Sequence, residues 1–278
     1  MKQLFDSVSF KCSEITTTSY STSFSFGIKA LNKALHTHIY NIYGFVRFAD
    51  EIVDSFHAFN KENLLKEFKE DTHKSIKRKI SLNPILNSFQ HTVNRYNIDL
   101  DLVNTFLDSM EMDLKPHLYD EDKYDKYILG SAQVVGLMCL KVFVDGNNSQ
   151  YIELKPHAMS LGSAFQKINF LRDIKADFEK LGRTYFPNVD MTKFNTEDKK
   201  NIEIDIKRDF ENALVGIKKL PKKSKSGVYL AYIYYFKLFE KIKALSPERI
   251  LSDRIRIPNR VKVYLICQIV IKDKLNLL

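Results

Sequence analysis

The chain is poor in the residues that break helices and in those that build disulfide frameworks or zinc fingers. Its 278 residues include 9 Gly, 7 Pro and 3 Cys, and Trp is absent. Cys12, Cys139 and Cys267 are odd in number, stand far apart and form no C-x-x-C pair. This usage indicates reduced, buried cysteines in a cytosolic protein.

Strand signals are equally scarce. Asp145-Gly146 follows a helical pattern and precedes two Asn residues, so it indicates a loop that ends a helix and not a hairpin turn. Helical periodicity recurs along the rest of the chain, and hydrophobic residues make up 44% of it. Helices are predicted over 28–57, 61–79, 84–96, 100–113, 122–145, 151–180, 196–219, 224–245 and 258–274. We expect one all-α domain over 1–278, with a central active-site cavity between its helices.

We expect no membrane-spanning segment in the N-terminal residues or in the C-terminal apolar stretch. The N-terminus has no signal-peptide core, and the apolar stretch from Val263 to Ile271 is short and contains Gln268. The net charge is +9, which suits nucleic acid, an anionic membrane surface or phosphorylated substrates. No zinc finger or RNA-binding motif supports a nucleic-acid partner. The dense lysine run at 218–225 fits a solvated loop.

Acidic residues with helical spacing stand out against this background. Tyr43, Arg47, Asp50 and Asp54 follow one another at steps of four, three and four, so they share a helix face. Apolar residues occupy the other faces, which predicts a buried helix where unpartnered charges are costly. Taken alone, this stripe also fits an Arg47–Asp50 ion pair on a surface.

A second stripe strengthens the case for a site. Gln166, Asn169, Asp173 and Asp177 share a face, and Arg172 lies on the neighbouring one. Two such helices facing each other would form a cage of hard oxygen ligands, which suits Mg²⁺, with Mn²⁺ as an alternative. Asp50, Asp54, Asn169, Asp173 and Asp177 are therefore predicted metal ligands, and the Arg and Tyr side chains would hold diphosphate oxygens.

Loss of diphosphate from an allylic carbon leaves a carbocation, which needs a dry cavity with aromatic walls. The chain has 20 Phe and 14 Tyr. The candidates for the lining are Phe24, Phe26, Tyr40, Tyr43, Phe165, Tyr232 and Tyr235. Each of them, considered singly, also fits ordinary core packing.

These motifs, in this order, resemble the squalene/phytoene synthase family over nearly the whole chain. The first acidic segment, I-Y-G-F-V-R-F-A-D-E-I-V-D, is similar to the family's first aspartate-rich motif, and L-G-S-A-F-Q-K-I-N-F-L-R-D-I-K-A-D-F-E-K-L-G-R-T-Y-F-P to its second signature. Tyr127 to Phe143 resembles the small-residue helix beside the family's cavity. The segment around Ser21, Ser23 and Phe24 resembles its S-x-S-F segment. The sequences of the central helix and of N-F-L-R-D-I-K-A-D-F are most like those of bacterial phytoene synthases.

Three positions depart from the family pattern. Tyr20 stands where many relatives have His. Glu51 makes the first motif D-E-x-x-D, which keeps its carboxylate chemistry and adds Glu51 to the candidate metal ligands. Gln133 interrupts the small-residue helix, which puts the shape of the cavity in doubt.

The resemblance implies an isoprenoid synthase fold and head-to-head condensation of two prenyl diphosphates through a cyclopropyl intermediate. From the motif sequences we expect the protein to convert two geranylgeranyl diphosphates to phytoene for carotenoid biosynthesis. The reaction would need Mg²⁺ and no NADPH. Asp50, Asp54, Asp173, Asp177, Tyr43 and Arg47 would be catalytic. The substrate contacts would be Ser21, Ser23, Phe24, Tyr43, Arg47, Gln166, Asn169, Arg172, Arg183, Tyr235 and Arg254.

Other functions stay open at this point. The close alternative is squalene or dehydrosqualene synthesis from two farnesyl diphosphates. A non-catalytic helical scaffold would be expected to lose acids from the cage, and a basic membrane- or nucleic-acid-binding protein would show strongly salt-dependent binding. We expect a cytoplasmic monomer or weak homodimer, peripheral to the inner face of the cytoplasmic membrane through its positive charge and its C-terminal helix.

Overall fold

The computed structural model describes residues 1–114, 120–181, 185–187, 189–190, 193–252, 255–258, 260–262, 264–265 and 268, and it describes no side chain within 176–181. No strand occurs in these parts, so the all-α prediction is confirmed. The helices are α1 (Lys2–Tyr20), α2 (Thr22–Lys29), α3 (Lys33–Asp54), α4 (Lys61–Arg78), α5 (Pro84–Tyr96), α6 (Leu100–Met112), α7 (Glu121–Ile128), the π-helical η1 (Leu129–Gln133), α8 (Val134–Phe143), α9 (Asn148–Leu181), α10 (Thr196–Lys219), α11 (Lys222–Lys243) and α12 (Pro247–Ser252).

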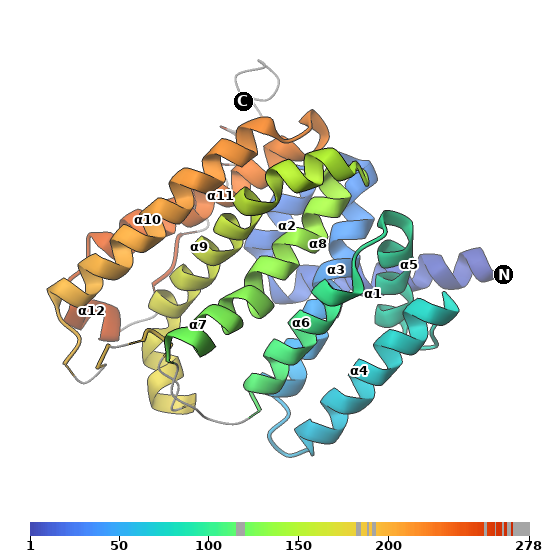
Figure 1. The fold of residues 1–278 in the computed structure, drawn as a ribbon, viewed down its shortest axis with the longest axis horizontal. Helices are drawn as coiled ribbons and strands as arrows, with labels where there is room; N and C mark the ends of the chain where they lie inside the picture. The colour runs from blue at the N-terminus through green and yellow to red at the C-terminus, as the bar shows by residue number, and fades with distance from the viewer. Residues whose placement is uncertain are drawn as a thin grey trace.

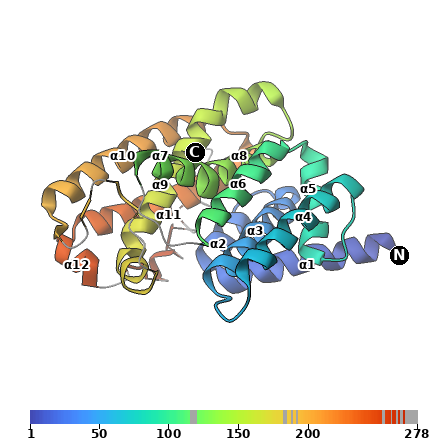
Figure 2. The ribbon, with the colours of Figure 1, turned by 60° about the horizontal axis from the view of Figure 1, so that its bottom comes forward.

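The helices form a bundle with α3, α8 and α9 at its centre (Figure 1). In that view α1, α4, α5 and α6 lie on one side, and α10, α11 and α12 on the other; the turned view in Figure 2 shows the same division. A single hydrophobic cluster runs through both sides and includes Phe45, Phe89, Phe106, Phe210 and Phe239, all at most 1% exposed. The central helices thus hold the two acidic motifs against one core.

Most predicted helices occur at the expected residues. The ranges predicted for α5 and α10 match the structure residue for residue. Asn83 caps α5 through its side-chain oxygen, and Asn195 forms a capping box with Asp198 at the start of α10, one residue before the start expected at Thr196. Local capping chemistry therefore sets these ends.

The prediction of one helix over 28–57 was wrong, because the chain breaks between α2 and α3. Asn32 ends the break by capping α3, and its backbone N–H donates to the Lys223 carbonyl of α11 at 2.9 Å. The helix predicted over 122–145 instead contains the π turn η1. Of the helix predicted over 258–274, residues 260–262, 264–265 and 268 are helical, and the others lie outside the described residues.

Helix α1 was not predicted, because its buried face carries small polar residues in place of an apolar stripe. Ser9, Ser13 and Thr17 are fully buried, whereas Leu4 and Ile15 are 69% and 63% exposed. A Cβ added at Gly44 of α3 would lie 2.9 Å from the Ser13 hydroxyl, so a small residue is needed on each helix for this close approach.

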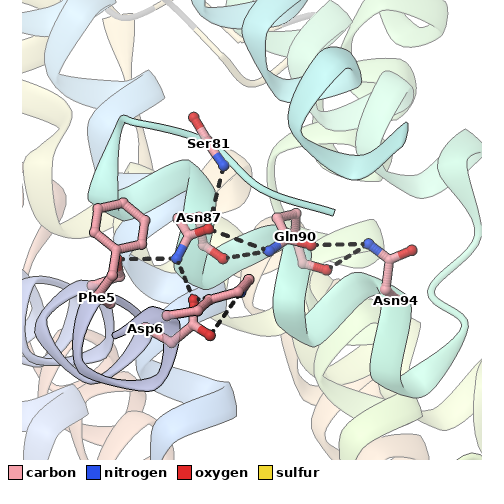
Figure 3. Close-up of polar contacts among 8 residues, drawn as sticks. Phe5, Asp6, Ser81, Asn87, Gln90 and Asn94 are labelled. Carbon is pink, nitrogen blue, oxygen red and sulfur yellow. Dashed lines mark hydrogen bonds and ion pairs between the residues drawn. The ribbon is translucent and has the colours of Figure 1, made fainter. Parts of the chain in front are cut away.

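A polar network joins α1 to α5 (Figure 3). The Asn87 side-chain amide donates to Asp6 at 3.0 Å and to Ser9 at 3.1 Å, and the Ser81 N–H donates back to the Asn87 oxygen at 3.3 Å. Buried donors and acceptors are thereby satisfied along the contact. This network holds α1 in place, with the Ser21–Phe24 segment at its end.

One segment, Glu121–Phe143, is long and apolar enough to cross a bilayer by length and composition. Half of its most apolar window is buried inside the protein. It packs against α6 and α9 and supplies Val134, Leu137 and Met138 to the core. These contacts are typical of a central core helix.

Candidate functional site

The first acidic stripe lies in the last three turns of α3. Arg47 and Asp50 are partly buried, whereas Asp54 is exposed in the last turn. The Arg47 Nη1 lies 4.0 Å from Asp50 Oδ2, and Nη2 donates to the Glu51 carboxylate. The ion pair considered from the sequence thus exists, but Glu51 is the nearer partner of the arginine.

Arg47 is held from a second side by α1. Its guanidinium carbon lies 4.4 Å above the ring of Tyr20, within the range of a cation–π contact. The Arg47 Nε atom is buried and has no hydrogen-bond partner in the described part of the chain. A buried N–H donor without a partner is costly, so this nitrogen is suited to an anionic oxygen of a ligand.

Ser21 and Phe24 lie beside this stripe because α2 begins there. The Ser21 hydroxyl caps α2 by accepting from the Phe24 N–H at 3.2 Å, and it also hydrogen-bonds Tyr43. The rings of Phe24 and Tyr43 are stacked at 4.9 Å. The S-x-S-F segment is thus adjacent to the first motif.

The second acidic stripe lies in the C-terminal half of α9. Arg172 holds Asp173 through both Nε, at 3.1 Å from Oδ1, and Nη2, at 2.5 Å from Oδ2. The Tyr235 hydroxyl of α11 lies 3.3 Å from the Asn169 side-chain oxygen, and its ring stacks on Phe165 at 3.9 Å. Tyr235 was predicted as a substrate contact, and it lies against the second motif.

The two stripes are linked electrostatically through their tyrosines. Burial raises the pKa of Tyr43, and the neighbouring charge of Arg47 opposes this rise. Burial likewise raises the pKa of Tyr235, and Arg172 opposes it. The charge of Tyr235 also raises the pKa of Tyr43. Tyr43 is thus under the influence of Arg47 of the first stripe, and Tyr235 under that of Arg172 of the second.

Other acidic residues lie near Asp50 and affect its pKa. Burial, then the charge of Asp54, raises the pKa of Asp50 to about 7, and Asp113 adds to the effect. Asp113 is buried at the end of α6 and accepts a hydrogen bond of 2.8 Å from the Tyr127 hydroxyl. Asp113 and Tyr127 were not among the predicted site residues. Only the packing of α6 and α7 beside α3 reveals them.

The residue types of the two stripes fit a divalent cation, because a carboxylate whose pKa is raised, as that of Asp50 is, gains from a neutralising positive charge. Among residues whose side chains are described, no group of three His, Cys, Asp or Glu side chains is close enough to hold an ion. The Asp177 side chain lies outside that set, and so do Arg183 and Arg254. The metal ligands therefore remain predictions.

The aromatic candidates divide into three groups. Phe24, Tyr43, Phe165 and Tyr235 form the stacked pairs beside the acidic stripes. Tyr40 and Tyr232 are buried in the core. Phe26 lines a small apolar cavity together with Ser23 of α2 and Tyr234 of α11. Gln166 is partly buried on α9. The large central cavity expected from the sequence stays a prediction.

Gln133, the departure in the small-residue helix, has a partner across the bundle. Its side-chain N–H₂ donates to the Ser163 hydroxyl of α9 at 2.6 Å. A Cβ at Gly162 would lie 2.8 Å from the Ala132 carbonyl, so η1 and α9 approach closely here. The glutamine therefore fastens η1 to the helix that carries the second motif.

Comparison with known proteins gives a consistent result. A family model for squalene/phytoene synthases matches residues 17–261. The chain is 30% identical over 194 residues to a phytoene synthase of Arthrospira platensis, covering 66% of this chain and 62% of that protein. It is 25% identical over 193 residues to a 4,4'-diapophytoene synthase of Staphylococcus haemolyticus, covering 67% and 65%.

The matched part thus spans slightly less than two thirds of the length of these two relatives. Among solved structures, a dehydrosqualene synthase in complex with ligand superposes with a TM-score of 0.82 at 19% identity, covering 98% of both chains. At this identity the superposition supports the fold alone.

Proposed function

The chain belongs to the squalene/phytoene synthase family, and we propose that it is a prenyltransferase that joins two geranylgeranyl diphosphates head to head to give phytoene. The observation that supports this best is that Tyr235, which lies 3.3 Å from Asn169 of the second stripe, is near enough to Tyr43 of the first stripe to influence its pKa. The phytoene synthase of Arthrospira platensis, similar over two thirds of this chain, supports the choice of product.

Each side chain has a role in this proposal that follows from its surroundings. Asp50, Asp54, Asn169, Asp173 and Asp177 would hold Mg²⁺, with Glu51 as a further candidate. The metal, when bound, would supply Lewis-acid stabilisation of the leaving diphosphate. The free Nε–H of Arg47 is suited to donate to a diphosphate oxygen.

The aromatic pairs would serve the hydrocarbon. Phe24 on Tyr43 and Phe165 on Tyr235 present π faces next to the charged groups. Such faces stabilise a developing allylic cation without offering it a nucleophile. The tyrosine hydroxyls stay protonated at neutral pH because burial raises the pKa of each, so they can donate hydrogen bonds to anionic oxygens.

Condensation of two farnesyl diphosphates to dehydrosqualene or squalene is the second candidate. The similarity to a 4,4'-diapophytoene synthase supports this second candidate. Incubation with each prenyl diphosphate and Mg²⁺, with and without NADPH, followed by mass spectrometry of the extracted hydrocarbon, separates the two. A product made only from farnesyl diphosphate would replace phytoene synthesis as the function.

We further propose that the enzyme acts in the cytoplasm as a monomer or weak homodimer, peripheral to the inner face of the cytoplasmic membrane. The net charge of +9 and the hydrocarbon product support this placement. Sedimentation velocity tests the oligomeric state. Flotation with liposomes tests the attachment.

A further inference from the structure

Lysines from two separate turns meet at one end of the bundle. Lys29 and Lys33 flank the turn between α2 and α3, and Lys218 and Lys223 flank the turn between α10 and α11. The hydrogen bond from the Asn32 N–H to the Lys223 carbonyl, 2.9 Å long, joins the two turns. We call these four lysines the lysine end. From the sequence, the lysine run at 218–225 was expected to be an ordinary solvated loop.

The charge of the lysine end is not balanced by acids. All four side chains belong to exposed residues, and none forms an ion pair in the described part of the chain. The neighbouring Lys219 is paired with Glu153 of α9 at 2.8 Å. Lysines that are exposed, clustered and unpaired create a positive potential that attracts anionic surfaces.

Exposed apolar residues lie beside this charge. Ile152 of α9 precedes Glu153 and is 64% exposed, and Val215 of α10 lies one turn before Lys219 and is 47% exposed. The Lys219–Glu153 pair therefore places the two aliphatic side chains near the lysines. Aliphatic groups among lysines suit the headgroup region of a bilayer, whereas nucleic-acid surfaces favour arginine and stacking aromatic rings.

The acidic motifs lie at the opposite end of the same helices. Lys33 is in the first turn of α3, and Asp50 follows about 25 Å along the helix axis. On α9, Glu153 and Asp173 are about 30 Å apart along the helix axis, and Glu153 is the residue that pairs with Lys219. Figure 1 shows the acid-bearing ends of α3 and α9 toward the bottom and the α10–α11 turn near the top.

We propose that the lysine end is the surface by which this protein docks on a bilayer containing anionic phospholipids. An anionic surface attracts the lysine end and repels the acidic end, so the charge separation along α3 and α9 also sets the orientation. The bilayer then faces the end of the bundle away from the diphosphate groups. The link to a hydrocarbon product rests on the proposed function, but the docking itself does not.

The test uses the full chain and two matched variants. In the first, Lys29, Lys33, Lys218 and Lys223 are all replaced by Gln. In the control, Gln replaces Lys66, Lys77, Lys200 and Lys237, four exposed lysines elsewhere that form no ion pair in the described residues. Both variants lose four positive charges, so they differ only in where the charge is lost. Thermal unfolding checks that both are folded.

Binding is measured by flotation with vesicles of equimolar phosphatidylglycerol and phosphatidylcholine, and with pure phosphatidylcholine. We expect the unmodified chain to bind only the anionic vesicles, the lysine-end variant to bind about a thousandfold more weakly and the control about as well as the parent. A third variant with Arg at the four positions should retain binding.

Three results would overturn the proposal. These are equal losses in the lysine-end variant and the control, no binding of anionic vesicles by the unmodified chain, or binding to duplex DNA that depends on the same lysines more strongly than vesicle binding. Because no substrate is present, the outcome is independent of which prenyl diphosphate the enzyme uses. Turnover in detergent solution tests the proposed function separately.

Discussion

Replacing Glu51 by Gln distinguishes two roles for this residue. The first motif places Glu51 among the candidate metal ligands, whereas in the structure its carboxylate accepts a hydrogen bond from Arg47. The Glu51 and Arg47 side chains are 19% and 25% exposed, so their pair is partly shielded from water. The favourable charge of Arg47 also contributes to lowering the pKa of Glu51, against the effect of burial.

The size of the expected effect follows from this geometry. A partly buried i, i+4 pair contributes about 1 kcal/mol, and its loss would free Arg47 to leave the orientation that we propose for binding the diphosphate. We therefore expect the Glu51→Gln variant to have a KM for the prenyl diphosphate raised about fivefold, with kcat little changed. The Mg²⁺ concentration for half-maximal turnover should stay the same.

The assay is steady-state kinetics over a range of substrate and Mg²⁺ concentrations. Glu67→Gln is the matched control, because Glu67 is exposed on α4 and forms no ion pair in the described part of the chain. Tyr20→Phe should keep the ring under Arg47 and lose only the hydrogen bond of its hydroxyl to Glu51, so it should raise KM less than Tyr20→Leu does. A collapse of kcat in Glu51→Gln, with a shifted Mg²⁺ requirement, would refute the pairing role and assign Glu51 to the metal.

Other changes give equally definite expectations. Asp50→Asn and Asp173→Asn should each lower kcat about a thousandfold with unchanged helix content by circular dichroism, since they remove charge and not packing; near-normal rates would exclude the metal cage. Tyr235→Phe should lower kcat/KM about fivefold without changing the melting temperature, because only the hydroxyl contact with Asn169 is lost and the ring stack stays; a large drop in melting temperature would mean a structural role. Burial lowers the pKa of His38 from 6.5 to about 4, so the unfolded chain takes up this proton first as the pH falls, and the protonation of His38 costs up to about 3 kcal/mol of stability between these pH values; urea titrations should show this loss as the difference between the parent and His38→Gln, and equal slopes in the two would contradict it.

The sequence predicts the fold well wherever burial is apolar. Helices such as α5 and α10 bury regular stripes of large apolar residues and have side-chain caps at their starts, so periodicity and capping define them. Helix α1 breaks this rule, because it buries Ser9, Ser13 and Thr17 and exposes its aliphatic residues. Hydrophobic periodicity carries no signal when the buried contact is between small polar residues.

Some residues of the candidate site could be found from the sequence, and others only from the packing of different helices. Spacing on a single helix groups Arg47 with Asp50 on α3, as the structure does, and Ser21 and Tyr235, predicted as substrate contacts, lie beside the two motifs. Asp113 could not be found in this way, because it approaches Asp50 only through the packing of α6 beside α3. Glu51 is a related case, since the motif indicates a ligand and only the geometry identifies Arg47 as its partner.

The identity of the hydrocarbon made by the purified protein tests the central claim most directly. The protein is incubated with Mg²⁺ and either geranylgeranyl or farnesyl diphosphate, with and without NADPH, and the extracted product is identified by mass spectrometry. We predict phytoene from geranylgeranyl diphosphate, formed equally well without NADPH. A thirty-carbon product alone, or no Mg²⁺-dependent release of diphosphate from either substrate, would contradict the account.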